Sequence, residues 1–456
     1  MKLQKLYDES SADTKYMGIM HAIEQGIEQG ILTAGEALPT QRELAEALQV
    51  TVGTVSRGYA EAVQRGLIVG VTGRGTFVAA RRDDVDVLRA SGTTAYNLGY
   101  ISPFEFLNPS LNESLARLSR QESLEYLTNY QEPRGLLRHR QAGALWAQRY
   151  GVHVDADNLL ICAGAQHALL TVLTSLFNPG DRIAAEHLTY PLLKQLAKRL
   201  CLHLVPLRMD GSGIVPESFE AACRAGGIKG LYLMPSCQNP TLAHIPDFRR
   251  HALVALCRRY DVTIIEDDVY ALALESTTEK SSPPFVRLAP ERTCFIAATS
   301  EALSGGLRIA YLCPPEAHAA ELERTISYTI SMAPPLMAEL AALWIQDGTA
   351  DRILAAKKQE AAARNVLART LLDGFALETR TTGFFAWLKL PSPWTSATFT
   401  DAACKQGVLV AEGDHFAIGH AGTEAGVRLA LGGLKSRVDL SNALLILANI
   451  LHQTRK

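Results

Sequence analysis

The hydrophobic pattern of the first eighty residues predicts a small helical unit. Apolar side chains recur at helical spacing across residues 15–29, and Thr40 with Glu43 forms a capping-box signature before a second helix, QRELAEAL. The stretch VGTVSRGYAEAVQRG is typical of a third helix closed by Gly66, and LIVGVTGRGTFV contains two short β-prone segments joined by a glycine-flanked turn. Three helices followed by a hairpin predict a winged helix-turn-helix over residues 1–80.

Such a module inserts its third helix into the major groove of DNA and rests its wing on phosphates or in the minor groove. The candidate DNA contacts are therefore Arg42, Thr51, Thr54, Ser56, Arg57 and Arg74. An alternative interpretation of the same pattern is a helical dimerisation unit with a solvated surface. Nine acidic residues outnumber seven basic ones through Ala80. We therefore expect non-specific attraction to phosphates to be weak and DNA binding to depend on dimerisation.

The segment LPTQRELAEALQVTVGTVSRGYAEAVQRGLIVGVTGRGTFV resembles the signature of the GntR family of bacterial regulators over its whole length. The match includes the proline before the second helix, the T-V-x-R-x-Y core of the third and the G-x-G-T-F-V wing. It departs from the family at Val52 and Gly53, where more polar or basic residues are usual. The resemblance implies that this unit binds double-stranded DNA.

The rest of the chain alternates β-prone runs with helical stretches. Residues 81–95 are charged and small without an apolar period, and we interpret them as a linker. Residues 96–456 show the alternating pattern of an α/β domain with a mostly parallel sheet. The predicted strands are NLLICA, DRIAAE, HLVPL, GLYLMP, VTIIED, TCFIAA and RIAYLC.

Composition narrows the class of protein. In 456 residues, 47% are hydrophobic and the net charge is -2, which excludes a collagen-like or largely disordered chain. No apolar run approaches the roughly 18 residues that span a bilayer, and the polar start MKLQKLYDESSADTKY has no signal-peptide core. The eight cysteines show no C-x-x-C spacing. We expect a cytoplasmic protein with reduced cysteines, no membrane association and no metal site.

Residues that follow the predicted strands form a recognisable series, since ligands of such sheets bind at the carboxyl ends of the strands. In chain order the segments are Gly164-Ala165-Gln166, SCQNP, Asp267-Asp268-Val269-Tyr270 and EALSGGLR. Together they resemble a fold-type I aminotransferase, one of the enzymes that use pyridoxal phosphate (PLP), from about Asn97 to the C-terminus. The resemblance implies helices on both faces of the sheet, a large part at about 96–335 and a small C-terminal α/β part at about 336–456. The whole arrangement, with its GntR-like unit, resembles the MocR subfamily of regulators.

The resemblance implies how the ring of a cofactor is held. Tyr190 in LTYP would stack on the pyridine ring, and Asn239 in QNP would donate a hydrogen bond to its phenolic oxygen. Asp267 would pair with the protonated pyridine nitrogen, which keeps the ring an electron sink. Asp268 is the alternative for that role, because the sequence EDD leaves the register open by one residue. Tyr270 would also approach the phenolic oxygen.

The resemblance also implies a phosphate site and a carboxylate site. The phosphate would be bound by Arg308, Ser300 and the amides of Ala165 and Gln166. Tyr130, in YQEPRG, would reach this phosphate from the partner subunit of a homodimer. Arg428, in VRLALGG, matches the arginine that clamps a substrate carboxylate.

The defining lysine of the aminotransferases is missing. The family pattern resembles S-x-S-K-x-L-x-P-G-L-R, whereas this chain reads ATSEALSGGLR, with Glu301 where the lysine belongs. Leu303 and the run GLR fix the register, and no lysine lies between Lys280 and Lys357. The hydroxyl residue and the proline of the pattern are also replaced, which favours natural drift over a single engineered substitution. A carboxylate cannot form an imine, so we expect transamination to be absent or slower by orders of magnitude.

These observations predict a homodimeric transcriptional regulator that binds an operator in double-stranded DNA and is not an enzyme. Its aminotransferase-like domain would sense a small-molecule effector without a covalent bond: PLP, pyridoxamine phosphate or an amino-acid adduct of PLP. Glu301 would bind an ammonium at the place of the lost lysine. Two alternatives remain: an active PLP-dependent aminotransferase with an accessory DNA-binding module, and a domain kept for dimerisation with an empty or unrelated site.

Overall fold

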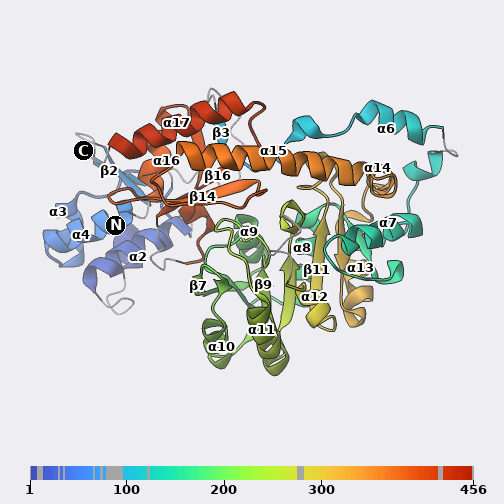
Figure 1. Cartoon of the computed structure of the whole chain (residues 1–456). Coiled ribbons are helices and arrows are strands. Elements are labelled where there is room, and N and C mark those ends of the chain that lie inside the picture. Colours follow the sequence, from blue (N-terminus) through green and yellow to red (C-terminus); the bar gives the residue numbers. More distant parts are fainter. Residues whose placement is uncertain are drawn as a thin grey trace. The chain divides into compact units, whose positions relative to one another are not determined.

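The computed structural model divides the chain into two compact units, Met1–Ala90 and Ser91–Lys456 (Figure 1). It describes residues 2–7, 14–28, 31–33, 36–64, 67–71, 75–78, 96–120, 124–274, 282–419 and 425–453. The predicted linker at 81–95, the helix terminator Gly66 and the wing-tip residue Arg74 lie outside these ranges.

The first unit contains the three helices and the hairpin that the sequence predicts, and one short helix, Lys2–Leu6, that it does not. Its elements are α1 (Lys2–Leu6), α2 (Lys15–Glu28), α3 (Gln41–Leu48), α4 (Val52–Gln64) and the antiparallel strands β1 (Ile68–Val71) and β2 (Gly75–Val78). Both bonds of the predicted capping box are present, since the Thr40 amide donates to Glu43 Oε2 and the Glu43 amide donates to Thr40 Oγ1. Gly58 lets α2 and α4 approach closely, because an added Cβ would lie 2.9 Å from the carbonyl oxygen of Tyr16.

The second unit is built on a seven-stranded sheet of order β4-β12-β11-β10-β9-β5-β6. All seven predicted runs supply its strands. Only β12 runs antiparallel to its neighbours, so the prediction of a mostly parallel sheet is confirmed. The strands are β4 (Leu160–Cys162), β5 (Arg182–Glu186), β6 (His203–Leu207), β9 (Ile228–Leu233), β10 (Thr263–Asp267), β11 (Thr293–Ala298) and β12 (Ala310–Cys313).

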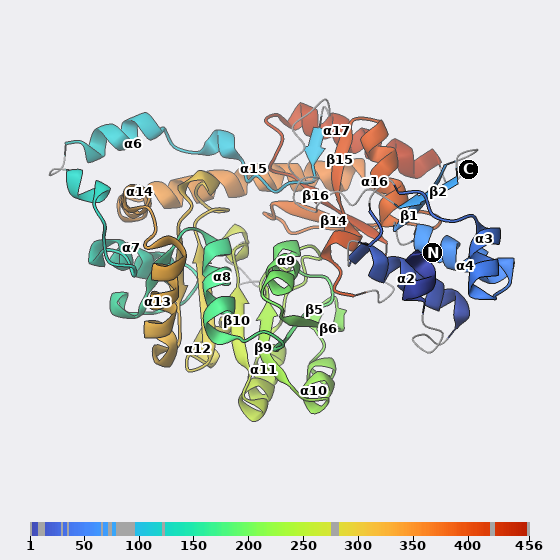
Figure 2. The same ribbon diagram turned by 180° about the vertical axis from the view of Figure 1, so that it is seen from behind.

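Helices cover both faces of this sheet. In Figure 1, α11 and α12 lie in front of the sheet, and in Figure 2, which shows the molecule from behind, α8 lies in front of it. Apart from the edge strand β6, of which only Leu207 is buried, the strands are almost wholly buried, which explains why they read as continuous apolar runs. A short hairpin, β7 (Met209–Asp210) and β8 (Gly213–Ile214), follows β6. The helices are α6 (Leu111–Leu118), α7 (Leu137–Gln148), α8 (Ala165–Leu176), α9 (Pro191–Arg199), α10 (Pro216–Arg224), α11 (Asp247–Tyr260), α12 (Phe285–Leu288), α13 (Ala319–Ile330) and α14 (Pro335–Gln346).

The C-terminal part forms a second sheet of order β13-β14-β16-β15-β3. Its strand β3 (Tyr96–Leu98) pairs in parallel with β15. These residues were predicted to begin the large part, at about 96–335, but they belong to the sheet of the C-terminal part. The other elements are α15 (Thr349–Leu371), β13 (Leu377–Glu378), β14 (Phe385–Lys389), α16 (Ser396–Lys405), β15 (Val408–Glu412), β16 (Gly426–Ala430) and α17 (Arg437–Gln453).

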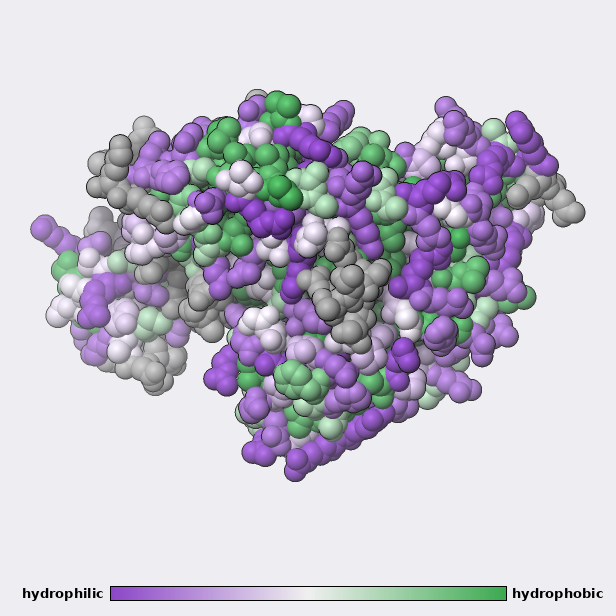
Figure 3. Space-filling model, in the orientation of Figure 1, coloured by the Kyte–Doolittle hydropathy of each residue, from purple (hydrophilic) through white to green (hydrophobic). Residues whose placement is uncertain are grey.

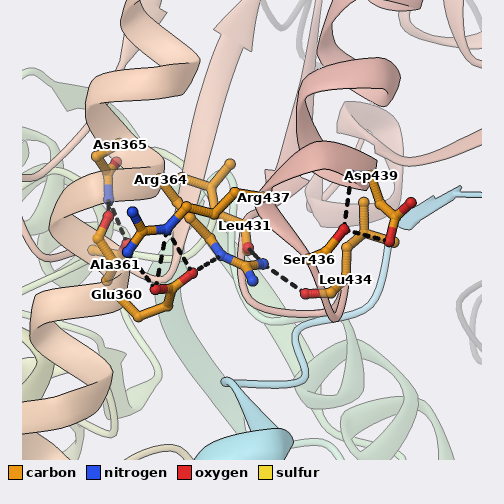
Figure 4. A network of polar contacts seen from close by, with 10 residues as sticks. Glu360, Ala361, Arg364, Asn365, Leu431, Leu434, Ser436, Arg437 and Asp439 are labelled. Atoms are coloured by element: carbon orange, nitrogen blue, oxygen red, sulfur yellow. Dashed lines mark hydrogen bonds and ion pairs between the residues drawn. The ribbon is translucent and has the colours of Figure 1, made fainter.

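A buried arginine fastens α15 to the segment between β16 and α17 (Figure 4). Arg364 Nη1 donates to the carbonyl oxygens of Leu431 and Leu434, each at 2.7 Å. Arg364 Nε pairs with Glu360 at 2.8 Å, and Glu360 also pairs with Arg437 at 2.7 Å. The network holds the end of β16 against α15, and β16 carries one of the predicted site residues.

The face of the molecule in Figure 3 is mostly polar, with apolar side chains gathered over α15 and α17. Val366, Val438 and Leu445 of these helices are exposed. No described helix combines the length and the apolar character needed to cross a membrane.

Candidate functional site

Polar residues from separate loops and strands of the second unit meet beyond the carboxyl end of β10. The Gln166 side chain at the start of α8 donates to the hydroxyl of Tyr190, just before α9, at 3.1 Å. Electrostatic interactions link Tyr190 and Tyr270 to the same two acids, Asp267 and Glu301. We call the following set the strand-end cluster: Gln166, Tyr190, Asn239, Asp267, Tyr270, Glu301 and Arg428.

The two aspartates at the end of β10, Asp267 within the strand and Asp268 just after it, have different partners. Asp268 accepts hydrogen bonds from the amide and the hydroxyl of Ser236, at 3.1 and 2.6 Å, so both its carboxylate oxygens are engaged. Asp267 accepts one bond from the Tyr232 hydroxyl at 2.8 Å, and its Oδ1 is buried without a partner. Burial raises the pKa of Asp267 to about 7. The geometry therefore favours Asp267 over Asp268 as the group able to receive a ligand proton donor.

Arg428 on β16 is buried with two of its nitrogens engaged by the protein. Nη1 donates to Asn239 Oδ1 at 2.9 Å, and Nη2 donates to the carbonyl oxygen of Gly99 at 2.7 Å. Nε is buried without a partner. The guanidinium lies 5.0 Å from the ring centroid of Phe416. Because Asn239 Oδ1 faces Arg428, the amide nitrogen of Asn239 remains as its donor toward other groups.

The aromatic residues of the cluster are enclosed. Tyr270 is buried and packs edge-to-face on Phe385, with 5.0 Å between ring centroids. Burial and the nearby Glu301 keep its pKa well above the ordinary range of a tyrosine. Burial likewise raises the pKa of Tyr190 to about 12. Both hydroxyls therefore stay protonated at neutral pH and can donate hydrogen bonds.

The N-terminus of α8 forms a cradle of the kind that binds phosphate. Gly164 precedes the helix with φ of 86°, and no side chain caps its first amides, those of Ala165 and Gln166. A Cβ on Gly164 would lie 2.4 Å from a guanidinium nitrogen of Arg308, so the glycine admits this side chain. The Arg308 guanidinium makes no hydrogen bond or ion pair with a described residue. The hydroxyl of Ser300 is buried and also lacks a partner.

One carboxylate oxygen of Glu301, Oε2, is buried and has no hydrogen-bond partner among the described residues. Burial raises the pKa of this carboxyl to about 7, against the opposing effect of three cations, Lys357, Arg428 and Arg308. The residue therefore exchanges its proton near neutrality.

Lys357 on α15 is a neighbour that the local sequence around Glu301 does not reveal. Its amine is fully buried, donates to the carbonyl oxygen of Leu303 at 2.7 Å, and lies 3.5 Å from that of Glu301. Burial lowers the pKa of Lys357 to about 8. The amine is thus engaged by the backbone of the loop that carries Glu301.

Tyr130 lies apart from the hydrogen bonds of the cluster. Its side chain is 88% exposed and makes no hydrogen bond with a described residue of its own chain. Three residues along the chain, Pro133 lines a surface hollow of about 350 Å³ together with residues of α13. The single chain therefore does not test the predicted role of Tyr130 toward a partner subunit.

The predicted DNA contacts that are described lie on α3, on α4 and just before α4. Arg42 and Arg57 are exposed, and the Arg57 guanidinium lies 4.6 Å from the ring centroid of Tyr16. Thr51 caps α4, since the Thr54 amide donates to its hydroxyl at 3.2 Å and the two hydroxyls are 2.9 Å apart. Ser56 is half-buried on α4, and these residues stay predicted contacts.

The cluster and the cradle fit a phosphorylated pyridine cofactor. Such a group carries a ring nitrogen, a phenolic oxygen and a phosphate. The atoms here that lack a partner among the described residues include groups suited to these parts, namely a carboxylate oxygen of Asp267, the hydroxyl of Ser300 and the guanidinium of Arg308. Among the described residues, no group of three or more His, Cys, Asp or Glu side chains could hold a metal ion.

Comparison with protein families assigns both units. Residues 15–78 match the family "Bacterial regulatory proteins, gntR family", and residues 105–440 match "Aminotransferase class I and II". The HTH-type transcriptional regulator YdeF of Bacillus subtilis is 31% identical over 96% of this chain and 94% of its own. The vitamin B6 salvage pathway transcriptional repressor PtsJ of Salmonella typhimurium is 28% identical over 91% of this chain and 94% of its own.

Solved structures agree on the fold of the second unit. The kynurenine aminotransferase of Pyrococcus horikoshii superimposes with a TM-score of 0.74 at 20% sequence identity, covering 82% of this chain and 94% of its own. The α-aminoadipate aminotransferase LysN of Thermus thermophilus superimposes with a TM-score of 0.73 at 21% sequence identity, covering 87% of this chain and 98% of its own. The predicted fold-type I architecture and the GntR unit are confirmed. The chain belongs to the family of GntR-type transcriptional regulators with an aminotransferase class I and II domain, the MocR type.

Proposed function

We propose that this DNA-binding regulator uses its aminotransferase-like domain as a homodimeric sensor that binds PLP, pyridoxamine phosphate or an amino-acid adduct of PLP without a covalent bond. The observation that carries the proposal is Glu301, a carboxylate at the expected lysine position inside a cluster with unsatisfied polar atoms. The names of two relatives, the repressor PtsJ and the pyridoxine biosynthesis regulator PdxR of Corynebacterium glutamicum, refer to vitamin B6 and support this ligand class.

Each part of the cofactor has a group in the chain that would hold it. Asp267 would pair with the ring nitrogen through its free oxygen, and the Asn239 amide would donate to the phenolic oxygen. Arg308 would bind the phosphate with Ser300 and the first amides of α8. When bound, PLP supplies a ring that withdraws electrons from its substituent. Tyr190 would cover one face of that ring.

The absence of an amine at position 301 separates binding from transamination. A carboxylate cannot attack an aldehyde carbon to form an imine, and it replaces the group that would move the α-proton of an amino acid. Lys357 does not supply the missing amine, because its hydrogen bonds to backbone carbonyls hold it on the loop that carries Glu301. We therefore propose that this domain recognises the vitamer and does not catalyse transamination.

Calorimetry and chemical trapping test the ligand half of the proposal together. We expect the purified full chain to release heat on titration with PLP or pyridoxamine phosphate. After PLP and borohydride treatment, we expect mass spectrometry of its peptides to find no stoichiometric lysine adduct at the site. The physical reason is that the cluster offers an acid and not an amine to the aldehyde.

Two outcomes would contradict this expectation. A stoichiometric adduct, at Lys357 or elsewhere in the domain, with turnover of an amino acid would establish the active aminotransferase as the better interpretation. The absence of heat with both vitamers would leave a domain kept for dimerisation, with an empty or unrelated site. A chain denatured before the PLP treatment is the control for adventitious labelling of exposed lysines.

We propose that this domain forms a homodimer, as the resemblance to the fold-type I aminotransferases implies. Tyr130 and Tyr328 are 88% and 81% exposed, so both side chains are available to contact a second copy. A second copy that covers them would bring its own Tyr130 toward the phosphate cradle of the first. Ligand binding would then act on DNA by favouring one arrangement of the two DNA-binding units, provided that the ligand binds the two states with different affinities.

Arg57 provides the test of the DNA-binding half. Because its guanidinium is exposed on the predicted recognition helix, Arg57→Ala should weaken binding to the operator by roughly 1–3 kcal/mol if the side chain reads a base. Gel-shift titrations with a palindromic or direct-repeat site upstream of the gene would measure the loss. Lys5→Ala, on α1, removes one exposed charge of the same unit as a matched control. Equal affinity of Arg57→Ala and the parent would reject α4 as the recognition helix.

A further inference from the structure

The carboxylate of Glu301 has several cationic neighbours, but none satisfies it. Lys357, Arg428 and Arg308 each act electrostatically on this carboxyl, yet none of them forms an ion pair with it. The Lys357 amine is directed at backbone carbonyls, and the terminal nitrogens of Arg428 bind Asn239 and Gly99. A buried carboxylate oxygen without a donor is costly, so the site favours a ligand that brings a donor of its own.

The length of the side chain places that donor on the ligand. Glutamate is one bond shorter than lysine, so it ends before the point at which a lysine nitrogen would join the aldehyde carbon of PLP. A nitrogen that the ligand itself carries on this carbon could donate a hydrogen bond to the carboxylate of Glu301. The amine form of the vitamin carries such a nitrogen, as a protonated primary amine on this carbon.

The charges of the amine form also match three of the groups that lack a partner. Its ring nitrogen would pair with the free oxygen of Asp267, its phosphate would bind Arg308 and the amides of α8, and its ammonium would bind Oε2 of Glu301. An aldehyde or an alcohol on the same carbon leaves Glu301 without a cation. We infer that the site selects pyridoxamine phosphate, the amine form, over the aldehyde and alcohol forms through Glu301. This inference rests on the proposed function.

A pair of ligands isolates the contribution of the ammonium. Pyridoxamine phosphate and pyridoxine phosphate differ only in carrying an ammonium or a hydroxyl, and neither reacts with exposed lysines as PLP does. We expect calorimetry on the full chain to give an affinity at least about 10-fold higher for the amine, as for a charge-assisted hydrogen bond replacing a neutral one. Glu301→Gln should bring the two affinities to within about threefold, mainly by weakening the amine.

Asp267→Asn is the matched control among the cluster variants. The ring nitrogen that faces Asp267 is common to both ligands, so this change should weaken both by a similar factor and leave their ratio unchanged. A thermal unfolding transition in each variant would confirm that the domain is folded. The ratio of the two ligand affinities in the unmodified protein tests the selectivity without any variant.

The pH dependence of the ratio gives a second readout. Protonation removes the charge of Glu301, so the preference for the amine should shrink as the pH falls through the pKa of this carboxyl, about 7 without ligand. The other groups that face Glu301 act on both ligands, so their titration largely cancels in the ratio; they are Lys357 on α15, Arg428 on β16, Arg308, Asp267, Tyr190 and Tyr270. In Glu301→Gln the ratio should be independent of pH over this range.

The possible results separate this inference from the proposed function. Equal affinities for the two phosphates in the unmodified protein would overturn the selectivity and leave the proposed ligand class intact. A preference that persists in Glu301→Gln would assign it to another group and overturn the role of Glu301. If neither phosphate nor PLP binds, the proposed function fails and the inference fails with it.

Discussion

Replacing Arg308 with alanine should weaken the binding of PLP or pyridoxamine phosphate roughly 100-fold, because two charge-assisted hydrogen bonds to the phosphate would be lost. The guanidinium is held beside the start of α8 by Gly164, which has no Cβ to displace it. It has no hydrogen bond within the described chain to give up when a phosphate arrives. Calorimetry with either vitamer would measure the loss.

Two further variants distinguish a phosphate contact from a general effect of charge. Arg308→Lys keeps the charge but not the forked geometry of the guanidinium. Its affinity for either vitamer should therefore lie between that of the parent and that of Arg308→Ala. Arg258→Ala, at an exposed arginine on α11, removes a cation remote from the cradle and should leave the affinity unchanged. Unchanged affinity in Arg308→Ala would remove the cradle from the proposed site.

The elements of the fold could be predicted because their signals are local. The capping box at Thr40 and Glu43 and the seven apolar runs of the large sheet are set by residues adjacent in the chain. The position of β3 could not be read in the same way. Its three residues pair with β15, more than three hundred positions later, and only tertiary packing determines such a partner.

The candidate site shows the same division between local and distant information. Resemblance placed Asp267 and Asp268 after one strand, but the choice between them depends on Ser236 and Tyr232, which come from other segments. Lys357 is far from Glu301 in sequence, yet α15 brings its amine to the carbonyls of the loop that carries Glu301. Tyr130 stays a prediction, because a second chain would be needed to bring it to the site.

The most decisive expected change is chemical. Glu301→Lys should convert a chain that binds PLP reversibly into one that carries about one covalently bound PLP, seen as visible absorbance and as a borohydride-stable adduct at position 301. The cations that now lower the pKa of Glu301, above all Lys357, would also lower that of a lysine amine at the same place. Burial acts in the same direction. The new amine would therefore be largely unprotonated and reactive toward an aldehyde near neutral pH.

The position of the adduct decides what the experiment means. Glu301→Gln is the matched control, because it removes the charge without adding an amine, and it should give no adduct. An adduct at position 301 would place this residue next to the aldehyde and show that the surrounding cluster still holds the ring. A folded Glu301→Lys variant that binds PLP but leaves it free would mean that position 301 does not face the aldehyde. The carboxylate would then be only a buried acid of the loop, and the interpretation of this domain as a sensor derived from an enzyme would lose its chemical basis.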